Sequence, residues 1–211
     1  MPLKFSVSRT RIDLIGCVAS VVDAIACLAF LVLQADLTNS ARALVECVVD
    51  PVTCMVVYWA LYWRLRDTRP ILAEAAFYAL FLGTFFIACE NGLEDLGNLN
   101  AFSLNSVYTN ELHTLLELLV AFTLPVGLAV YAWLITSSPP LRRWLGFLIG
   151  GQVVCLYMSL ASFRIPQVWE FVDSQVLTIY AIILSLAKAV WFLSPVAGSK
   201  IVPVDREKRG P

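Results

Sequence analysis

The amino-acid sequence predicts an all-α protein, a polytopic membrane helix bundle with six transmembrane helices and both termini in the cytosol. Hydrophobic residues make up 59% of the 211 residues and charged residues 15%. The mean hydropathy is +0.77, and together these values exclude an ordinary soluble domain. The apolar residues form six runs without the alternation of barrel strands, each long enough to cross a hydrocarbon core of ~30 Å as a helix. The runs cover residues 12–34, 43–63, 72–93, 112–136, 143–163 and 174–195.

Basic residues predict the orientation of the helices, because short cytosolic loops carry the excess of lysine and arginine. They gather before the first run, after the second, after the fourth and in the tail. These residues are Lys4, Arg9, Arg11, Arg64, Arg66, Arg69, Arg142, Arg143, Lys200, Arg206, Lys208 and Arg209. We therefore expect both termini in the cytosol, which requires an even number of spans. The first run is about twice as long as the apolar region of a signal peptide, so we expect a retained helix.

The first two runs carry acidic residues at different depths. Asp23 lies ~17 Å into the first run, near the midplane. A structural ion pair with Lys188 of the last run is favoured over a proton relay. In the second run, Glu46 and Asp50 are four residues apart and share one helical face. Asp50 lies ~10 Å below the non-cytosolic surface, and Pro51 predicts a kink.

Later runs bring further acids to the same half of the membrane. Glu90 lies near the non-cytosolic end of the third run, and the fourth run begins with His113 and Glu117, four residues apart on one face. The sixth run begins near Asp173. Acidic side chains close to the membrane surface also extend to water. Acidic side chains deeper in the membrane mostly face the bundle interior and mark functional sites. We expect Asp50, Glu90 and Glu117 to line a polar cavity.

The connections predict a single domain over residues 1–199. Residues 64–70 and 136–141 are short links, so sequential helices are expected to be antiparallel neighbours in a compact bundle. Residues 94–111 form the one longer connection, which we interpret as a solvated loop. Residues 200–211 form a polar tail in the cytosol.

Composition and residue spacing indicate no cofactor. The six cysteines lie within the apolar runs without metal-ligand spacing, so they are interpreted as small hydrophobic residues. His113 is the one histidine, and carboxylates alone make an unusual zinc site, so no metal is expected. A net charge of −1 gives no indication of nucleic-acid binding. The expected partners are membrane lipid and a hydrophobic small molecule. The sequence does not decide whether the protein forms a homodimer.

Four sequence features follow one another from the third run to the sixth. They are Glu90 in FFIACENG, Glu117 and Pro125 in ELLVAFTLPVGL, Gly151, Gln152 and Tyr157 after the basic turn SSPPLRRW, and Lys188-x-x-Trp191 in LAKAVWFLSP. In this order, over residues 72–199, they resemble the emopamil-binding protein family, whose EXPERA-type members include sterol Δ8–Δ7 isomerases. Two positions depart from the family pattern, since a family histidine is Phe86 here and a family asparagine is Lys188.

The resemblance implies a membrane-embedded isomerase or cyclase of a sterol or terpenoid, in the endoplasmic reticulum. That chemistry needs an acid that protonates a double bond, an apolar pocket for the carbocation and a base. A carboxylic acid desolvated in a bilayer can stay protonated near neutrality. Glu90 and Glu117 would share these roles with His113 assisting. The residues expected to bind the substrate are Asp50, Gln152, Tyr157, Lys188 and Trp191, and Trp191 would offer its π face to positive charge.

Lys188 complicates this interpretation, because an ammonium repels a carbocation. It must be neutral, paired with an acid or turned away. A non-catalytic sterol binder or accessory subunit stays open, and Phe86 in place of the family's histidine favours it. Transport of protons or cations by the intramembrane acids is a third class, disfavoured by the lack of repeats. A retinal Schiff base on Lys188 is disfavoured by six spans and by the position of the lysine away from mid-helix.

Overall fold

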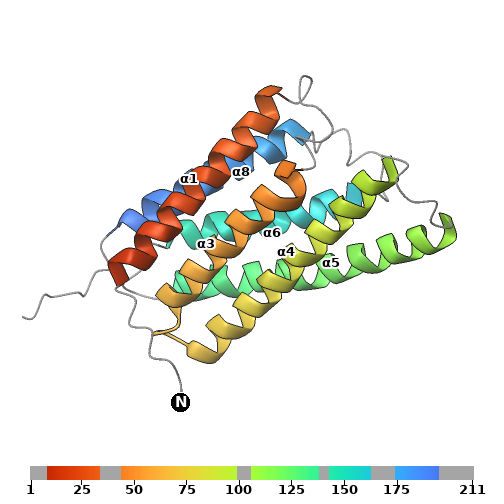
Figure 1. Cartoon of the computed structure of the whole chain (residues 1–211). Helices are drawn as coiled ribbons and strands as arrows, with labels where there is room; N and C mark the ends of the chain where they lie inside the picture. The colour runs from red at the N-terminus through yellow and green to blue at the C-terminus, as the bar shows by residue number, and fades with distance from the viewer. Residues whose placement is uncertain (1–8, 34–43, 99–105, 138–142, 163–173, 195–211) are drawn as a thin grey trace, which may run out of the picture.

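The computed structural model is a bundle of helices (Figure 1). It describes residues 9–33, 44–98, 106–137, 143–162 and 174–194, and these residues contain no strand. The all-α prediction is therefore confirmed for the described part of the chain. The predicted polar tail and Asp173 lie outside it.

Six α-helices and one π-helical turn make up the described residues. They are α1 (Arg9–Leu33), η1 (Val45–Val49), α3 (Asp50–Leu65), α4 (Pro70–Asn98), α5 (Ser106–Ser137), α6 (Trp144–Ser162) and α8 (Ser174–Leu193). Their bounds follow the six apolar runs closely, because a chain in lipid must satisfy every backbone polar group within its own helix. The main difference is that α4 and α5 extend into the connection predicted as a solvated loop, which leaves residues 99–105 between them.

Length and composition mark several of these helices as membrane helices. Within the described side chains, four helical segments are long and apolar enough to cross a membrane. They are Arg9–Val32, Val45–Leu65, Pro70–Leu93 and Glu111–Ser137. Trp144–Tyr157 and Leu177–Leu193 are apolar but shorter.

The helices form a closed ring. Each one packs against its neighbours along the chain, α6 packs against α8, and α8 lies against α1. Consecutive helices run in opposite directions, with α1 and α8 side by side at one edge and α4 and α5 at the other (Figure 1). Sequential helices are thus neighbours, as the short connections predict, and all six helices border the middle of the ring.

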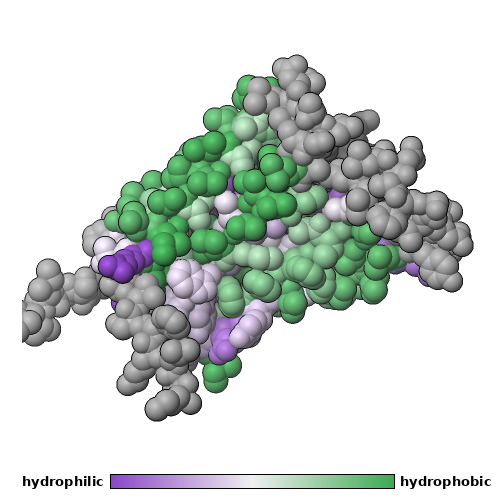
Figure 2. All heavy atoms as spheres, in the orientation of Figure 1, coloured by the Kyte–Doolittle hydropathy of each residue, from purple (hydrophilic) through white to green (hydrophobic). Residues whose placement is uncertain are grey.

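Large apolar side chains cover the outside of the ring. Exposed examples are Val18 and Ile25 of α1, Phe85 of α4, Phe122 of α5 and Phe147 of α6. Figure 2 shows this hydrophobic surface along the helices, with hydrophilic residues near the start of α1 and the turn between α3 and α4. An apolar surface this extensive is typical of contact with lipid or another protein.

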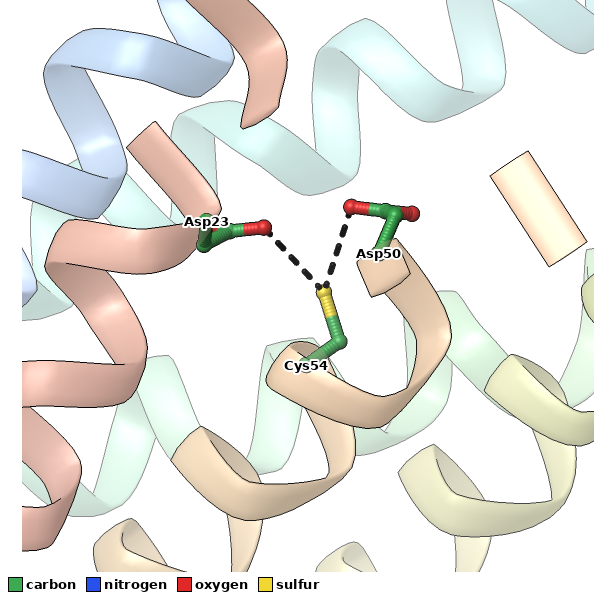
Figure 3. A group of neighbouring side chains, drawn as sticks. All are labelled: Asp23, Asp50 and Cys54. Carbon is green, nitrogen blue, oxygen red and sulfur yellow. Dashed lines mark hydrogen bonds between the residues drawn. The ribbon is translucent and has the colours of Figure 1, made fainter. Parts of the chain in front are cut away.

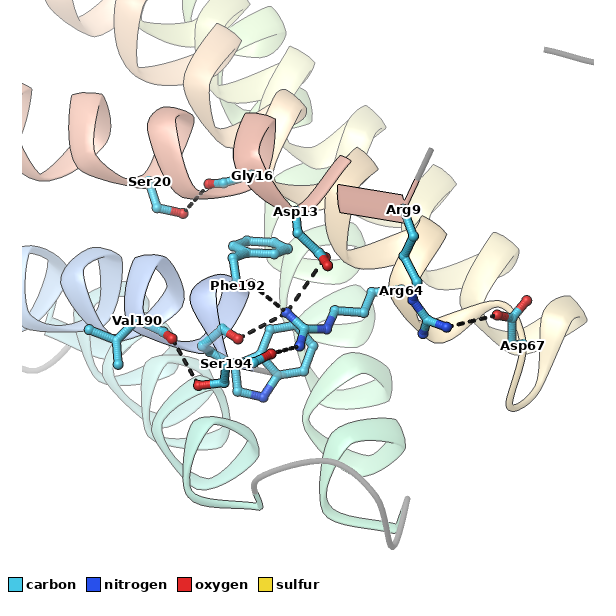
Figure 4. A network of polar contacts seen from close by, with 10 residues as sticks. Arg9, Asp13, Gly16, Ser20, Arg64, Asp67, Val190, Phe192 and Ser194 are labelled. Carbon is cyan, nitrogen blue, oxygen red and sulfur yellow. Dashed lines mark hydrogen bonds and ion pairs between the residues drawn. The ribbon is translucent and has the colours of Figure 1, made fainter. Parts of the chain in front are cut away.

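Arg64 joins three helices at one end of the ring (Figure 4). Its guanidinium donates hydrogen bonds to the backbone carbonyls of Trp191 at 2.9 Å, Phe192 at 3.2 Å and Ser194 at 2.6 Å. The same group lies 3.6 Å from the Asp13 carboxylate of α1 and 4.0 Å from the ring centroid of Trp191. The last carbonyls of a helix lack intrahelical partners. Arg64 therefore caps α8 from α3 while pairing with α1.

The position of Arg64 corrects its assignment to a loop. The residue lies in the last turn of α3 and is 3% exposed. Hydropathy ends an apolar run at the first charge, whereas the helix continues because the carbonyl groups of α8 and the Asp13 carboxylate satisfy the guanidinium there.

Gly16 allows the close approach of α1 at this same end. A Cβ atom on Gly16 would lie 2.7 Å from the Phe192 ring and 2.8 Å from the Ala60 Cβ. Only a residue without a side chain fits between α8 and α3 at these distances.

Candidate functional site

A cavity of about 210 Å³ lies in the middle of the ring, and every one of the six α-helices contributes to its wall. Its polar lining is Asp23, Cys27, Asp50, Cys54, Tyr58, Thr84, Gln152, Ser185 and Lys188. Leucine, isoleucine and alanine side chains complete the wall. The cavity thus combines carboxyl groups, thiols and an amine with apolar surface.

Asp50 enters the cavity from an irregular turn. Pro51 has no N–H to offer the carbonyl four residues earlier, and the residues before Asp50 form the π-helical turn η1. The backbone N–H of Asp50 accordingly donates to the carbonyl of Val45, five residues back. π-Helical turns inside membrane-length helices often occur at functional sites. The irregularity predicted at Pro51 is therefore a widened turn immediately before it.

Asp23, Asp50 and Cys54 meet in the cavity (Figure 3). The Cys54 Sγ lies 3.9 Å from an oxygen of each carboxyl group. The potential ligand atoms of all three residues lie within 4.8 Å of one another, so the two carboxyl groups are close neighbours. Two ionised carboxylates this close repel, so a proton held between them is stabilising.

The remaining hydrogen bonds of Asp23 come from hydroxyl groups. Ser185 of α8 donates to one oxygen, and Thr53 of α3 lies 3.5 Å from the other. The sequence predicts an ion pair between Asp23 and Lys188. Among the described residues, no carboxylate oxygen lies within the 4.0 Å of an ion pair from the Lys188 Nζ. Ser185, three residues before Lys188 on the same face of α8, occupies the place next to Asp23.

Lys188 is buried in the cavity wall without a close polar partner. The residue is 3% exposed, and its ammonium lies 5.9 Å from the ring centroid of Tyr58. No hydrogen bond joins its Nζ to any described residue. The Gln152 Oε1 is buried without a hydrogen-bond partner in the same part of the structure. Unsatisfied polar atoms are rare inside native proteins and call for an explanation at each occurrence.

Two further spaces adjoin the central cavity. One of about 330 Å³ lies between α1, η1, α4 and α8 and shares Cys27, Asp50 and Ala181 with it. The other, of about 190 Å³, shares Gln152 and Ala181. Together they reach the range of ligand pockets, roughly 300–1,000 Å³.

A second polar cluster joins α4 and α5. The His113 Nε2 lies 3.6 Å from a Glu90 oxygen, and the Nδ1 lies 3.8 Å from a Glu117 oxygen. The side chains are 42%, 20% and 38% exposed for His113, Glu90 and Glu117 respectively. The structure thus brings the three predicted catalytic residues together. None of them lines the cavities described above.

Both clusters contain groups that bind metals in other proteins. At the α4–α5 cluster, each imidazole nitrogen of His113 faces a different carboxylate. A single metal ion could bind only one of these two nitrogens. This arrangement fits a set of acid–base groups in ion-pair contact better than a metal centre.

Two of the predicted substrate-binding residues lie away from the cavity. Tyr157 is 50% exposed on α6. Trp191 is 1% exposed beneath the guanidinium of Arg64. Asp50, Gln152 and Lys188 do line the cavity. Sequence reasoning missed Ser185, although its spacing from Lys188 is a signal for a shared helical face.

No protein-family model matches the chain, and neither a curated protein nor a solved structure matches it.

Proposed function

We propose that the protein is a membrane-embedded isomerase or cyclase that protonates a double bond of a sterol or terpenoid in the central cavity. One observation carries the proposal. Asp23 and Asp50 form a carboxyl pair in a wall that also presents leucine, isoleucine and alanine side chains and the ring of Tyr58. Alkene protonation requires this combination, an acid beside a hydrophobic substrate and away from water.

The carboxyl pair supplies both steps of the reaction. One carboxyl group, carrying the shared proton, is the acid, and the other accepts a proton from the neighbouring carbon. Tyr58 lines the same cavity and offers a π face to the positive charge that develops on the substrate. The adjoining spaces around Ala181 hold the rest of the hydrocarbon.

The α4–α5 cluster is the second acid–base candidate, as the sequence predicts. Glu90, His113 and Glu117 can pass a proton along one line of contacts. These three residues are partly exposed and line none of the cavities, which favours Asp23 and Asp50 for the chemical step.

The topology belongs to the same proposal. We infer six spans, cytosolic termini and the endoplasmic reticulum. The six helices alternate in direction and form a ring that α8 closes against α1, which supports an even number of membrane spans. The start of α1 and the basic α3–α4 turn lie at one end, where Arg9 is 3.8 Å from Asp67, which supports a common cytosolic side.

Deuterium incorporation tests the function. The full-length protein in microsomes is incubated in deuterated water with Δ8-sterols and with linear polyprenyl or meroterpenoid substrates. The expected result is a rearranged, deuterated product whose rate falls about 100-fold or more in Asp50→Asn. Glu117→Gln, a matched loss of one carboxylate outside the cavity, should retain most of that rate.

The opposite pattern, in which only Glu117→Gln loses product formation, would indicate that the reaction takes place at the α4–α5 cluster. No product from either substrate class, from a folded protein that still binds lipid, would contradict catalysis and favour a non-catalytic binder.

A further inference from the structure

Lys188 is the one amine of the chain inside a described helix. The other lysines are Lys4, Lys200 and Lys208, near the ends of the sequence. Burial of an ammonium without hydrogen-bond acceptors is costly. The side chain nevertheless lines the central cavity together with the carboxyl groups of Asp23 and Asp50. A lysine amine inside a partly apolar cavity is the group that proteins use as a nucleophile for carbonyl carbon.

We propose that the Lys188 Nζ forms a Schiff base with an aldehyde or ketone group of an isoprenoid lipid, and that such carbonyl compounds are the substrate class. This inference rests on the proposed isomerase function and specifies how the substrate is held. It also accounts for a lysine in a site where a free ammonium would repel a carbocation.

The covalent step balances without an external reagent. The neutral amine adds to the carbonyl carbon, which gives a carbinolamine. A carboxylic acid of the Asp23–Asp50 pair protonates its hydroxyl group, water leaves, and the carbon–nitrogen double bond of an iminium ion forms. The nitrogen then carries the positive charge, and the carboxylate that gave up its proton balances that charge.

The isomerisation uses the same groups. A carboxylate removes a proton from the carbon next to the iminium carbon of a β,γ-unsaturated substrate, which gives a dienamine. The resulting carboxylic acid returns a proton to the γ carbon, so the double bond moves into conjugation. Water then hydrolyses the iminium ion, and the amine and the carbonyl group are restored. No electron is gained or lost overall, and the water released in the first step is consumed in the last.

Three neighbours of Lys188 fit this chemistry. Tyr58 presents its ring 5.9 Å from the nitrogen, where it can stabilise the iminium charge. The unpartnered Gln152 Oε1 can accept a hydrogen bond from the carbinolamine hydroxyl. Asp50, at the junction with the larger adjoining space, can reach a substrate carbon beyond the carbonyl group.

Borohydride trapping tests the proposal. The full-length protein in detergent micelles is incubated with farnesal, an isoprenoid aldehyde, and then reduced with sodium borohydride. Intact mass and peptide mapping should find one reduced farnesyl adduct on Lys188, absent from Lys188→Met and from Lys188→Arg. Labelling confined to the terminal lysines, equal mass gain in Lys188→Met, or no adduct would overturn the proposal.

Deuterium turnover separates this inference from the proposed function. For this comparison the deuterium assay uses a β,γ-unsaturated isoprenoid ketone, because a Schiff base needs a carbonyl group. Undiminished turnover of that ketone in Lys188→Met would overturn the Schiff base and leave the isomerase intact. An adduct on Lys188 in a protein that isomerises neither sterols nor terpenoids would support a carbonyl-binding site and contradict the proposed reaction.

Discussion

Arg64 and Lys188 are both 3% exposed, and their surroundings differ sharply. The Arg64 guanidinium has three backbone carbonyls, the Asp13 carboxylate and the Trp191 ring around it. The Lys188 ammonium has an aromatic ring at 5.9 Å and lines a cavity. Desolvation of a charge is offset only by well-placed partners. The first cation therefore holds the fold together, whereas the second has the surroundings that we propose for a ligand-binding group.

Arg64→Ala is expected to give the largest effect. The substitution leaves the last carbonyls of α8 and the Asp13 carboxylate without their partner, which should lower the free energy of unfolding by about 3 kcal/mol. Unfolding in detergent micelles, followed by tryptophan fluorescence, measures the change. Arg66→Ala is the matched control, because Arg66 is 40% exposed and should cost less than about 0.5 kcal/mol. Equal losses in the two variants would contradict a structural role for Arg64.

Gly16→Ala is expected to give an intermediate loss at the same end of the ring. The added methyl group would meet Phe192 and Ala60 at less than 3 Å, and such overpacking costs about 1–3 kcal/mol. Gly150→Ala is the control, since its Cβ would meet only Ala132 at 3.9 Å. Alanine is the better helix former by up to about 1 kcal/mol, so the control should be neutral or stabilising. The same unfolding assay tells whether the two changes differ in sign.

Lys188→Met is expected to change stability least. The amine makes no hydrogen bond or ion pair with the described residues, so the free energy of unfolding should change by less than about 1 kcal/mol. Turnover of a β,γ-unsaturated isoprenoid ketone in the deuterium assay should nevertheless be lost. A destabilisation as large as that of Arg64→Ala would place Lys188 among the structural residues and remove the contrast between the two cations.

The bounds of the helices could be predicted from the sequence, because long apolar runs are the segments that can lie in lipid as helices. The pairing of Glu90, His113 and Glu117 could be predicted too, since depth and the four-residue spacing restrict where these side chains lie. Arg64 shows the limit of this approach. Its charge marked it as a loop residue, whereas its partners are carbonyl groups on a helix more than a hundred residues away in the chain.

The rotation of each helix about its own axis could not be predicted from the sequence. Hydropathy is nearly uniform around a lipid-embedded helix, so it does not tell that Tyr157 faces outward or that Trp191 lies under Arg64. The partner of Asp23 also depended on this rotation. A serine and a lysine three residues apart compete for the same carboxylate, and packing of α1 against α8 places the serine closer.

Ligand protection of two cysteines tests the central claim, that the cavity around Asp50 and Lys188 binds the substrate. Single-cysteine proteins that retain Cys54, in the cavity, or Cys89, next to Glu90, are labelled with N-ethylmaleimide, with and without farnesal. The predicted result is slower labelling of Cys54 and an unchanged rate at Cys89. Protection of Cys89 alone would place the ligand at the α4–α5 cluster and contradict the account.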